Sequence, residues 1–86
     1  MLDSAKNIIN DLHALVEDFD KIGWTAIEQR RFNDTLEKLF RTIPRKMNKV
    51  ANFILPVGLP TTSYTKEATK IIDREQKLYD ILLADF

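Results

Sequence analysis

The chain contains 86 residues, 44% of them hydrophobic and 30% charged, and its formal net charge at pH 7 is zero. This hydrophobic content excludes a disordered chain, and the length allows one hydrophobic core but not two. The absence of cysteine excludes disulfide bonds and thiolate metal ligands, and no segment approaches the roughly 20 apolar residues that cross a bilayer. We therefore expect one domain over residues 1–86, located in the cytoplasm, with no membrane partner.

The first predicted element is an amphipathic helix near the N-terminus. Between Asp3 and Phe19 the apolar residues recur at steps of three and four, which places them on one face of a helix. The pattern predicts that this helix ends near Asp20, before Gly23. Its apolar face comprises Ala5, Ile8, Ile9, Leu12, Leu15, Val16 and Phe19.

A second helix is expected from the segment Thr25-Ala26-Ile27-Glu28, which has the form of a capping box. In such a box the threonine hydroxyl accepts a backbone N–H of the first turn, and the glutamate reaches back to the cap. Trp24 precedes the cap and has two interpretations: it packs the turn onto the core, or it stands exposed as an anchor for a partner. The apolar residues of this helix are Ile27, Phe32, Leu36, Leu39, Phe40 and Ile43.

Two further helices are expected in the second half of the chain. Pro44 suits the first turn of a helix but not its interior, so it predicts a short third helix that Pro56 ends. Residues 57–63 are rich in helix breakers and hydroxyl groups and predict a loop, after which Ser63 or Thr65 caps a last helix. That helix carries a long apolar face formed by Ala68, Ile71, Ile72, Leu78, Tyr79, Leu82 and Leu83.

Four amphipathic helices with mostly short connections can bury their apolar faces only against one another. The sequence therefore predicts an all-α fold, a compact four-helix bundle with one short helix. The bundle is expected to be irregular where Pro44 leaves almost no linker between the second and third helices. Because the chain ends on the apolar residue Phe86, we expect a fragment of a longer polypeptide.

The polar residues show no recognisable catalytic pattern. The single histidine, His13, has Glu17 at the i+4 position, and this pair supplies half a metal site at most, since catalytic zinc usually takes three protein ligands. The alternative is a solvated histidine on a helix surface. Neither glycine lies in a phosphate-binding loop. We therefore predict a non-catalytic chain with no cofactor and no metal ion.

The middle of the chain is uniformly basic. Residues 38–66 contain six lysines and arginines and no acidic residue, whereas residues 1–22 contain five acidic residues and two lysines. Two interpretations stay open: an exposed basic surface that meets phosphates or an acidic protein, or bases that pair with the acidic helices of the same bundle. The basic residues around the predicted joint between the second and third helices are Lys38, Arg41, Arg45, Lys46 and Lys49.

Two short segments carry a family resemblance. One is Leu39-Phe40-Arg41-Thr42-Ile43-Pro44-Arg45-Lys46-Met47, and the other is Ile71-Ile72-Asp73-Arg74-Glu75-Gln76-Lys77-Leu78. Together they resemble the helical segment that precedes the catalytic domain in some bacterial poly(ADP-ribose) polymerase-like proteins. The resemblance implies a helical regulatory region that packs beside an NAD-using ADP-ribosyltransferase domain and restrains it. None of that family's NAD-binding or catalytic positions has a counterpart in this chain, so catalysis is expected elsewhere.

The leading prediction is a non-catalytic helical interaction or regulatory module of a larger intracellular protein. Its partner is expected to be a protein domain of the same polypeptide, and no oligomeric state follows from the sequence. The alternative is a nucleic-acid-binding helical domain that uses the basic region 38–49. The predicted partner-binding residues are Trp24, Arg41, Arg45, Lys46 and Lys49.

Overall fold

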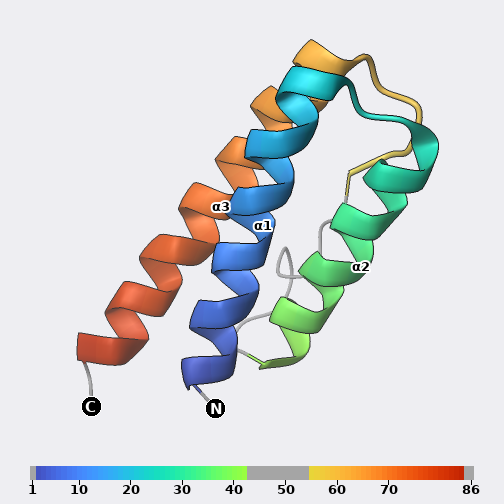
Figure 1. Cartoon of the computed structure of the whole chain (residues 1–86). Coiled ribbons are helices and arrows are strands. Elements are labelled where there is room, and N and C mark those ends of the chain that lie inside the picture. The colour runs from blue at the N-terminus through green and yellow to red at the C-terminus, as the bar shows by residue number, and fades with distance from the viewer. Residues whose placement is uncertain (1, 43–54, 85–86) are drawn as a thin grey trace.

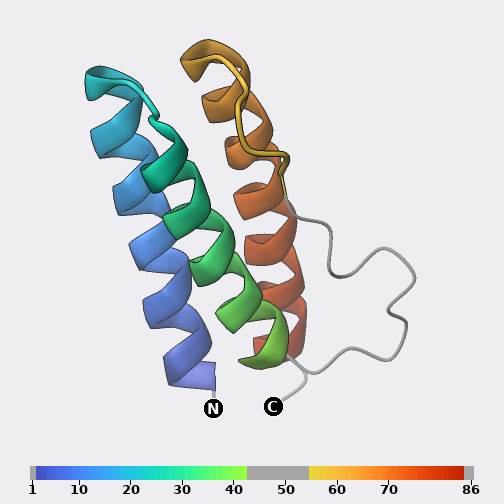
Figure 2. The same ribbon diagram turned by 90° about the vertical axis from the view of Figure 1, so that its right-hand side faces the viewer.

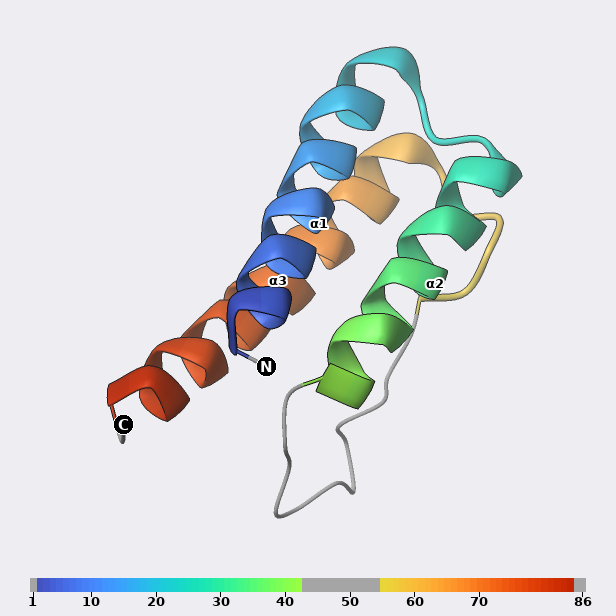
Figure 3. The same cartoon turned by 60° about the horizontal axis from the view of Figure 1, so that its bottom comes forward.

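A computed structural model describes residues 2–42 and 55–84, and within these residues the chain forms three helices and no strand. α1 (Leu2–Ile22) is followed by α2 (Ala26–Thr42), which returns antiparallel to it, and α3 (Thr61–Ala84) runs parallel to α2 (Figure 1). α1 packs against both other helices, whereas the helical segments α2 and α3 make no close backbone contact with each other (Figure 3). The prediction of an all-α fold is confirmed.

The predicted number of four helices is wrong for the described residues, which contain three. The short helix expected from Pro44 falls in residues 43–54, which lie outside the described part of the chain. Leu55, the last residue before Pro56, is not helical. The side chain of Asn33 accepts a hydrogen bond from its backbone N–H and donates one to its carbonyl, so an α2 side chain takes the bonds that a helix would use.

α1 ends two residues later than the sequence predicts, at Ile22. Gly23 then adopts a positive φ of 106°, and its N–H donates to the carbonyl of Phe19 at 2.9 Å. This left-handed glycine closes the helix, because a residue with a side chain adopts that backbone conformation only under strain.

α2 begins where the capping box predicts, with Thr25 as its cap. The carbonyl of Thr25 accepts the N–H of Gln29 at 3.0 Å, and the Thr25 hydroxyl donates to the carboxylate of Glu28 at 2.5 Å. The predicted start of the helix is confirmed. The hydrogen bond that the structure gives to the threonine hydroxyl joins two side chains rather than a side chain and the backbone.

α3 begins earlier than predicted, at Thr61, so neither Ser63 nor Thr65 is its cap. Its first turn is closed by the N–H of Tyr64, which donates to the carbonyl of Pro60 at 2.9 Å. The hydroxyl of Thr65 instead accepts a hydrogen bond from the indole N–H of Trp24. Threonine often caps the start of a helix, but here the Thr65 hydroxyl makes a tertiary contact instead.

One core joins the three helices and the segment that leads into α3. Residues 55–60 run beside the N-terminal half of α2 before the chain turns into α3 (Figure 2). No helix in the described part of the chain is long and apolar enough to span a membrane. The buried hydrophobic residues are Ala5, Ile9, Leu12, Trp24, Phe32, Leu36, Leu39, Phe40, Leu55, Tyr64, Ala68, Ile71, Ile72 and Tyr79.

Candidate binding surface on helices α1 and α2

The sequence left open whether Trp24 packs onto the core or stands exposed, and the structure shows it packed. Its side chain is 6% exposed, and its ring lies against three other aromatic rings, those of Phe19, Phe32 and Tyr64, at centroid distances of 4.7 to 5.8 Å. Both of its N–H groups bind α3: the backbone N–H donates to the Thr61 hydroxyl at 3.0 Å and the indole N–H to that of Thr65 at 2.9 Å. Trp24 therefore fastens the α1–α2 turn to α3, and it offers no exposed ring to a partner.

Two buried amide side chains on α2, Gln29 and Asn33, hold the segment that leads into α3. The Gln29 amide donates to the carbonyl of Leu59 at 3.0 Å, and its oxygen accepts the N–H of Gly58 at 2.8 Å. Asn33 makes the same pair of bonds to Leu55, at 2.8 and 3.2 Å. We call these two residues the amide clamp. They fix the path of residues 55–59 along α2 because each satisfies both backbone groups that it faces.

Gln29 and Asn33, the two residues of the amide clamp, were not predicted from the sequence. One signal was available: Gln29 and Asn33 are four residues apart and share the helix side that carries Leu36 and Phe40, so they interrupt an apolar face. Buried amides in such a position need partners of their own, which predicts a backbone segment against them. The sequence does not say which segment, because the partners lie 22 to 30 residues away.

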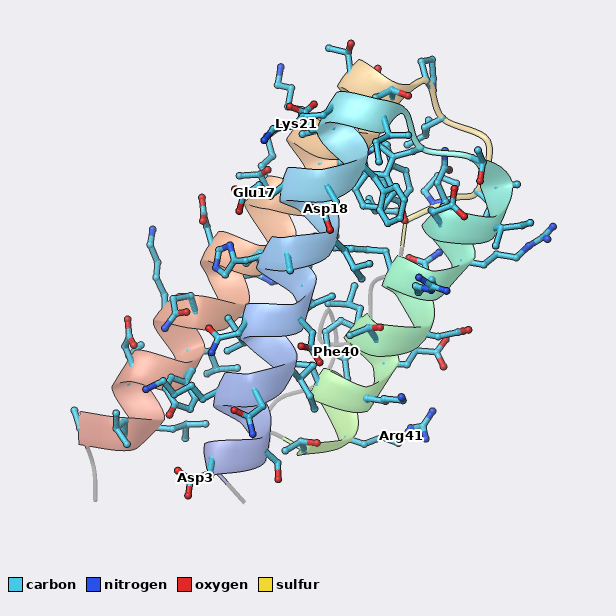
Figure 4. The ribbon with its side chains drawn as sticks, viewed as in Figure 1. Asp3, Glu17, Asp18, Lys21, Phe40 and Arg41 are labelled. Atoms are coloured by element: carbon cyan, nitrogen blue, oxygen red, sulfur yellow. The ribbon has the colours of Figure 1, made fainter. Side chains whose placement is uncertain are left out.

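The opposite side of α2 points away from the bundle. Ile27 is 68% exposed, and a shallow depression of about 450 Å³ lies along this side. Arg41 continues the surface toward the end of the helix and points away from the rest of the molecule (Figure 4). The depression is lined by Ile27, Arg30, Arg31, Asp34, Thr35 and Lys38.

A second groove, of about 300 Å³, separates α2 from α1 on the same surface. Asp18 of α1 lies on the side that faces α2, whereas Glu17 and Lys21 lie on the other side of α1 (Figure 4). The groove is lined by Asp11, Ala14, Leu15 and Asp18 from α1 and by Arg31 and Thr35 from α2. The wall that α1 supplies is acidic, and the wall that α2 supplies is basic.

Helical spacing extends these two walls along the helices. On α1, Ile22 follows Asp18 by one turn, and on α2, Ile27 precedes Arg31 by one turn. Ile22 is 77% exposed, which makes this pair of isoleucines the two most exposed large hydrophobic residues in the described chain. We call the whole surface the α1–α2 face; it comprises Asp11, Ala14, Asp18, Ile22, Ile27, Arg31, Thr35 and Lys38.

Charge pairing on the outer side of α2 is sparse. Arg41 pairs with Glu37 of the same helix at 3.5 Å, and both side chains remain largely exposed. Arg30, Arg31 and Lys38 make no ion pair in the part of the chain that the structure describes. The basic side chains of α2 are therefore not neutralised by the acidic residues of α1, although Asp18 and Arg31 line the same groove.

Of the predicted partner-binding residues, Trp24 and Arg41 lie in the described part of the chain, and the structure does not bring them together: Trp24 is in the core, and Arg41 is exposed at the far end of α2. Arg45, Lys46 and Lys49 lie outside the described residues. Arg30 and Arg31 were not predicted as binding residues, because the basic segment of the sequence begins at residue 38. The charges on the outer side of the second helix are evident only in the structure.

His13, Glu75 and Tyr64 are not part of the α1–α2 face. His13 is exposed on α1, and no cluster of three potential metal ligands occurs among the described residues. Glu75, buried in α3, accepts a hydrogen bond from Arg74 at 3.3 Å. Burial raises the pKa of the Tyr64 phenol well above its usual value of about 10, because the phenolate would lose its hydration. The Tyr64 hydroxyl donates to the carbonyl of Gln29 at 3.0 Å.

Compared with models of protein families, with curated proteins and with solved structures, the chain gives no match.

Proposed function

We propose that this chain is a non-catalytic interaction module that binds an acidic protein surface through the outer side of α2. The observation that supports the proposal is the set of three cationic side chains, Arg30, Arg31 and Lys38, which line one depression and make no ion pair within the described residues. Ile27 lies beside them, exposed. Cations beside an exposed apolar side chain are typical of a surface that combines steering by charge with burial of apolar area.

The mixed charge of the surface favours a protein over a nucleic acid. Asp34 lies within the depression, and Asp11 and Asp18 lie across the neighbouring groove. Carboxylates in these positions repel a phosphate backbone, whereas a protein partner can present groups of both signs. The formal net charge of zero points the same way, since nucleic-acid-binding modules are usually strongly basic.

A finer form of the proposal places this module beside an ADP-ribosyltransferase domain, as the resemblance of its two segments implies. The structure bears on those segments only in part. Leu39 and Phe40 belong to the core, as do Ile71 and Ile72, so these residues support the bundle whatever its partner is. The regulatory role stays a prediction.

The proposal can be tested with a fluorescently labelled polyglutamate peptide as the acidic probe and duplex DNA as the competing one. We expect the peptide to bind at low salt, with an affinity that falls as salt rises. The double variant Arg31→Glu/Lys38→Glu should bind the peptide more weakly, by a factor of up to about ten, because two surface charge contacts are lost. Fluorescence anisotropy measures both.

The matched control is Lys66→Glu/Lys77→Glu, which makes the same change in net charge at two exposed positions of α3. An equal loss of affinity in this control contradicts a specific surface on α2, because the effect then follows net charge alone. Absence of peptide binding by dilute, monomeric protein at low salt contradicts the proposal outright. Tighter binding to the DNA duplex than to polyglutamate, lost in the α2 variant, supports the nucleic-acid alternative instead.

A further inference from the structure

The α1–α2 face carries its charges in two parallel columns of opposite sign. The acidic column on α1 consists of Asp11 and Asp18, and the basic column on α2 of Arg31 and Lys38, with the single carboxylate of Asp34 between them. Both pairs are seven residues apart, which is two helical turns. The two helices are antiparallel, and the groove between them is lined by both members of the acidic column and by Arg31.

Between the charged residues of this face, small side chains line the groove. Ala14 on α1 and Thr35 on α2 line the groove halfway between the charges, and both side chains are small. Another helical surface can therefore come close to the backbone of this face at its centre. At the end near the turn, the two columns finish with the exposed isoleucines Ile22 and Ile27.

We infer that the occupant of the α1–α2 face is a second copy of this chain, related to the first by a two-fold axis that runs parallel to the helices. Such an axis keeps each residue at its level and places α1 of one copy over α2 of the other. The acidic column of each copy then faces the basic column of the other, so the charge contact is made twice. This inference rests on the proposed function, since α1 of the second copy supplies the acidic surface.

The charges select this arrangement over the other two-fold arrangement that the face permits. An axis that lies in the interface but perpendicular to the helices places α1 over α1 and α2 over α2. It brings Asp11 and Asp18 of the two copies together, and likewise Arg31 and Lys38, which repel each other. The axis parallel to the helices instead opposes the acidic column of each copy to the basic column of the other.

The exposed isoleucines fit the same arrangement. Ile22 and Ile27 end the two columns near the turn, so the isoleucines of both copies lie at the same end of the interface. An isolated chain leaves them in water, at 77% and 68% exposure. Burial of these side chains supplies the apolar part of the interface, while the charge columns fix its register.

The face is small and its charges are exposed, so the dimer is expected to be weak, reversible and sensitive to salt. Sedimentation velocity at low salt and a range of protein concentrations measures it. We expect the chain to dimerise as concentration rises, and the dissociation constant to increase when salt is added. A chain that stays monomeric at low salt and high concentration overturns the inference.

Two charge-reversed variants test the arrangement itself. Asp11→Lys/Asp18→Lys makes both columns basic, and Arg31→Glu/Lys38→Glu makes both acidic, so each variant alone should be monomeric. In an equimolar mixture every contact again joins unlike charges, and a heterodimer should form with an affinity within about tenfold of that of the original dimer. Circular dichroism checks that both variants keep their helices, as their exposed positions predict.

The control Asp20→Lys/Asp73→Lys reverses two exposed acidic residues that are not part of the α1–α2 face, and it should dimerise as before. Dimers that persist in both charge-reversed variants, or a mixture that stays monomeric, overturn the inference. Ile27→Asp is a second probe and should also give a monomer.

The two proposals fail separately. A monomeric chain that binds polyglutamate through Arg31 and Lys38 overturns the dimer and supports the proposed function. A monomeric chain that does not bind the peptide overturns both.

Discussion

The two sides of α2 differ in how many of their side chains are buried or have partners within the chain. On the inner side, Phe32 is fully buried, and both amides of the clamp bind backbone groups of residues 55–59. On the outer side, Ile27 is exposed and Lys38 has no ion-pair partner among the described residues. The inner side of α2 therefore holds the fold together, whereas the outer side stays exposed to solvent and is the surface that we propose for contacts. We expect the two sides to differ in energy as they do in structure.

The largest difference is expected from removing an inner aromatic ring. Phe32→Ala should lower the free energy of unfolding by about 3–5 kcal/mol, because the substitution leaves a cavity in the core. The ring also packs edge-on against Trp24 and Tyr64, at centroid distances of 5.8 and 5.9 Å. Urea denaturation followed by circular dichroism measures the loss.

The matched change on the outer side is Ile27→Ala. Since this side chain is mostly in water, the free energy of unfolding should change by no more than about 0.5 kcal/mol. The measurement is made on dilute protein at high salt, so that self-association does not contribute. Similar losses in the two variants contradict the division of α2 into a structural and a free side.

A smaller loss is expected when the amide clamp is opened. Asn33→Ala leaves both backbone groups of Leu55 buried without their present partner, and it should cost about 2–4 kcal/mol. Hydrogen exchange at the Leu55 N–H should accelerate at the same time. Asn10→Ala, at an exposed position of α1, is the control and should change stability by about 0.5 kcal/mol or less. A stable Asn33 variant with a protected Leu55 N–H contradicts the role of the clamp.

A smaller effect than that of the amide clamp is expected at high pH and comes from Tyr64. Its folded pKa is raised by burial, so above about pH 10 the unfolded chain releases the phenolic proton while the folded chain retains it. Stability is therefore unaffected by this group below pH 10 and falls above it, by up to about 1.4 kcal/mol per pH unit. Urea denaturation over this pH range measures the slope.

Tyr64→Phe separates this effect from the titration of lysines. The variant loses the hydrogen bond to the Gln29 carbonyl, at a cost of about 1 kcal/mol, but its stability should fall less steeply above pH 10. Equal slopes in the two proteins show that Tyr64 does not titrate as its burial requires.

Local patterns in the sequence predicted much of the fold. The start of α2 follows from Thr25 and Glu28, and the end of α1 lies close to Gly23, because caps depend on residues within one turn. Most of the apolar faces were also predictable, since helical periodicity places their residues on one side, but Ile27 and Leu83 are exposed. The start of α3 was not, because Thr61 and Thr65 bind Trp24, some 40 residues earlier in the chain.

The candidate surface was predictable only in part. The basic character of Lys38 and Arg41 is evident from the charge pattern, and the structure shows both side chains exposed. Arg30 and Arg31 were missed because three acidic residues of the same helix, Glu28, Asp34 and Glu37, mask them in a count along the chain. In three dimensions Glu37 pairs with Arg41, while Arg31 lies across a groove from Asp18. Charge summed along a sequence does not show which charges share a side of a helix.

The helical character of this chain, the position of the first turn and most of the core residues follow from the sequence alone. These properties depend on neighbours within a few positions, where the geometry of a helix relates spacing directly to direction. The burial of Trp24, the hold of Gln29 and Asn33 on the segment before α3, and the acidic and basic columns on one face are evident only in three dimensions. Each of these features depends on how separate helices pack. Packing brings together residues that are far apart in the chain, and their separation in sequence does not predict their distance in space.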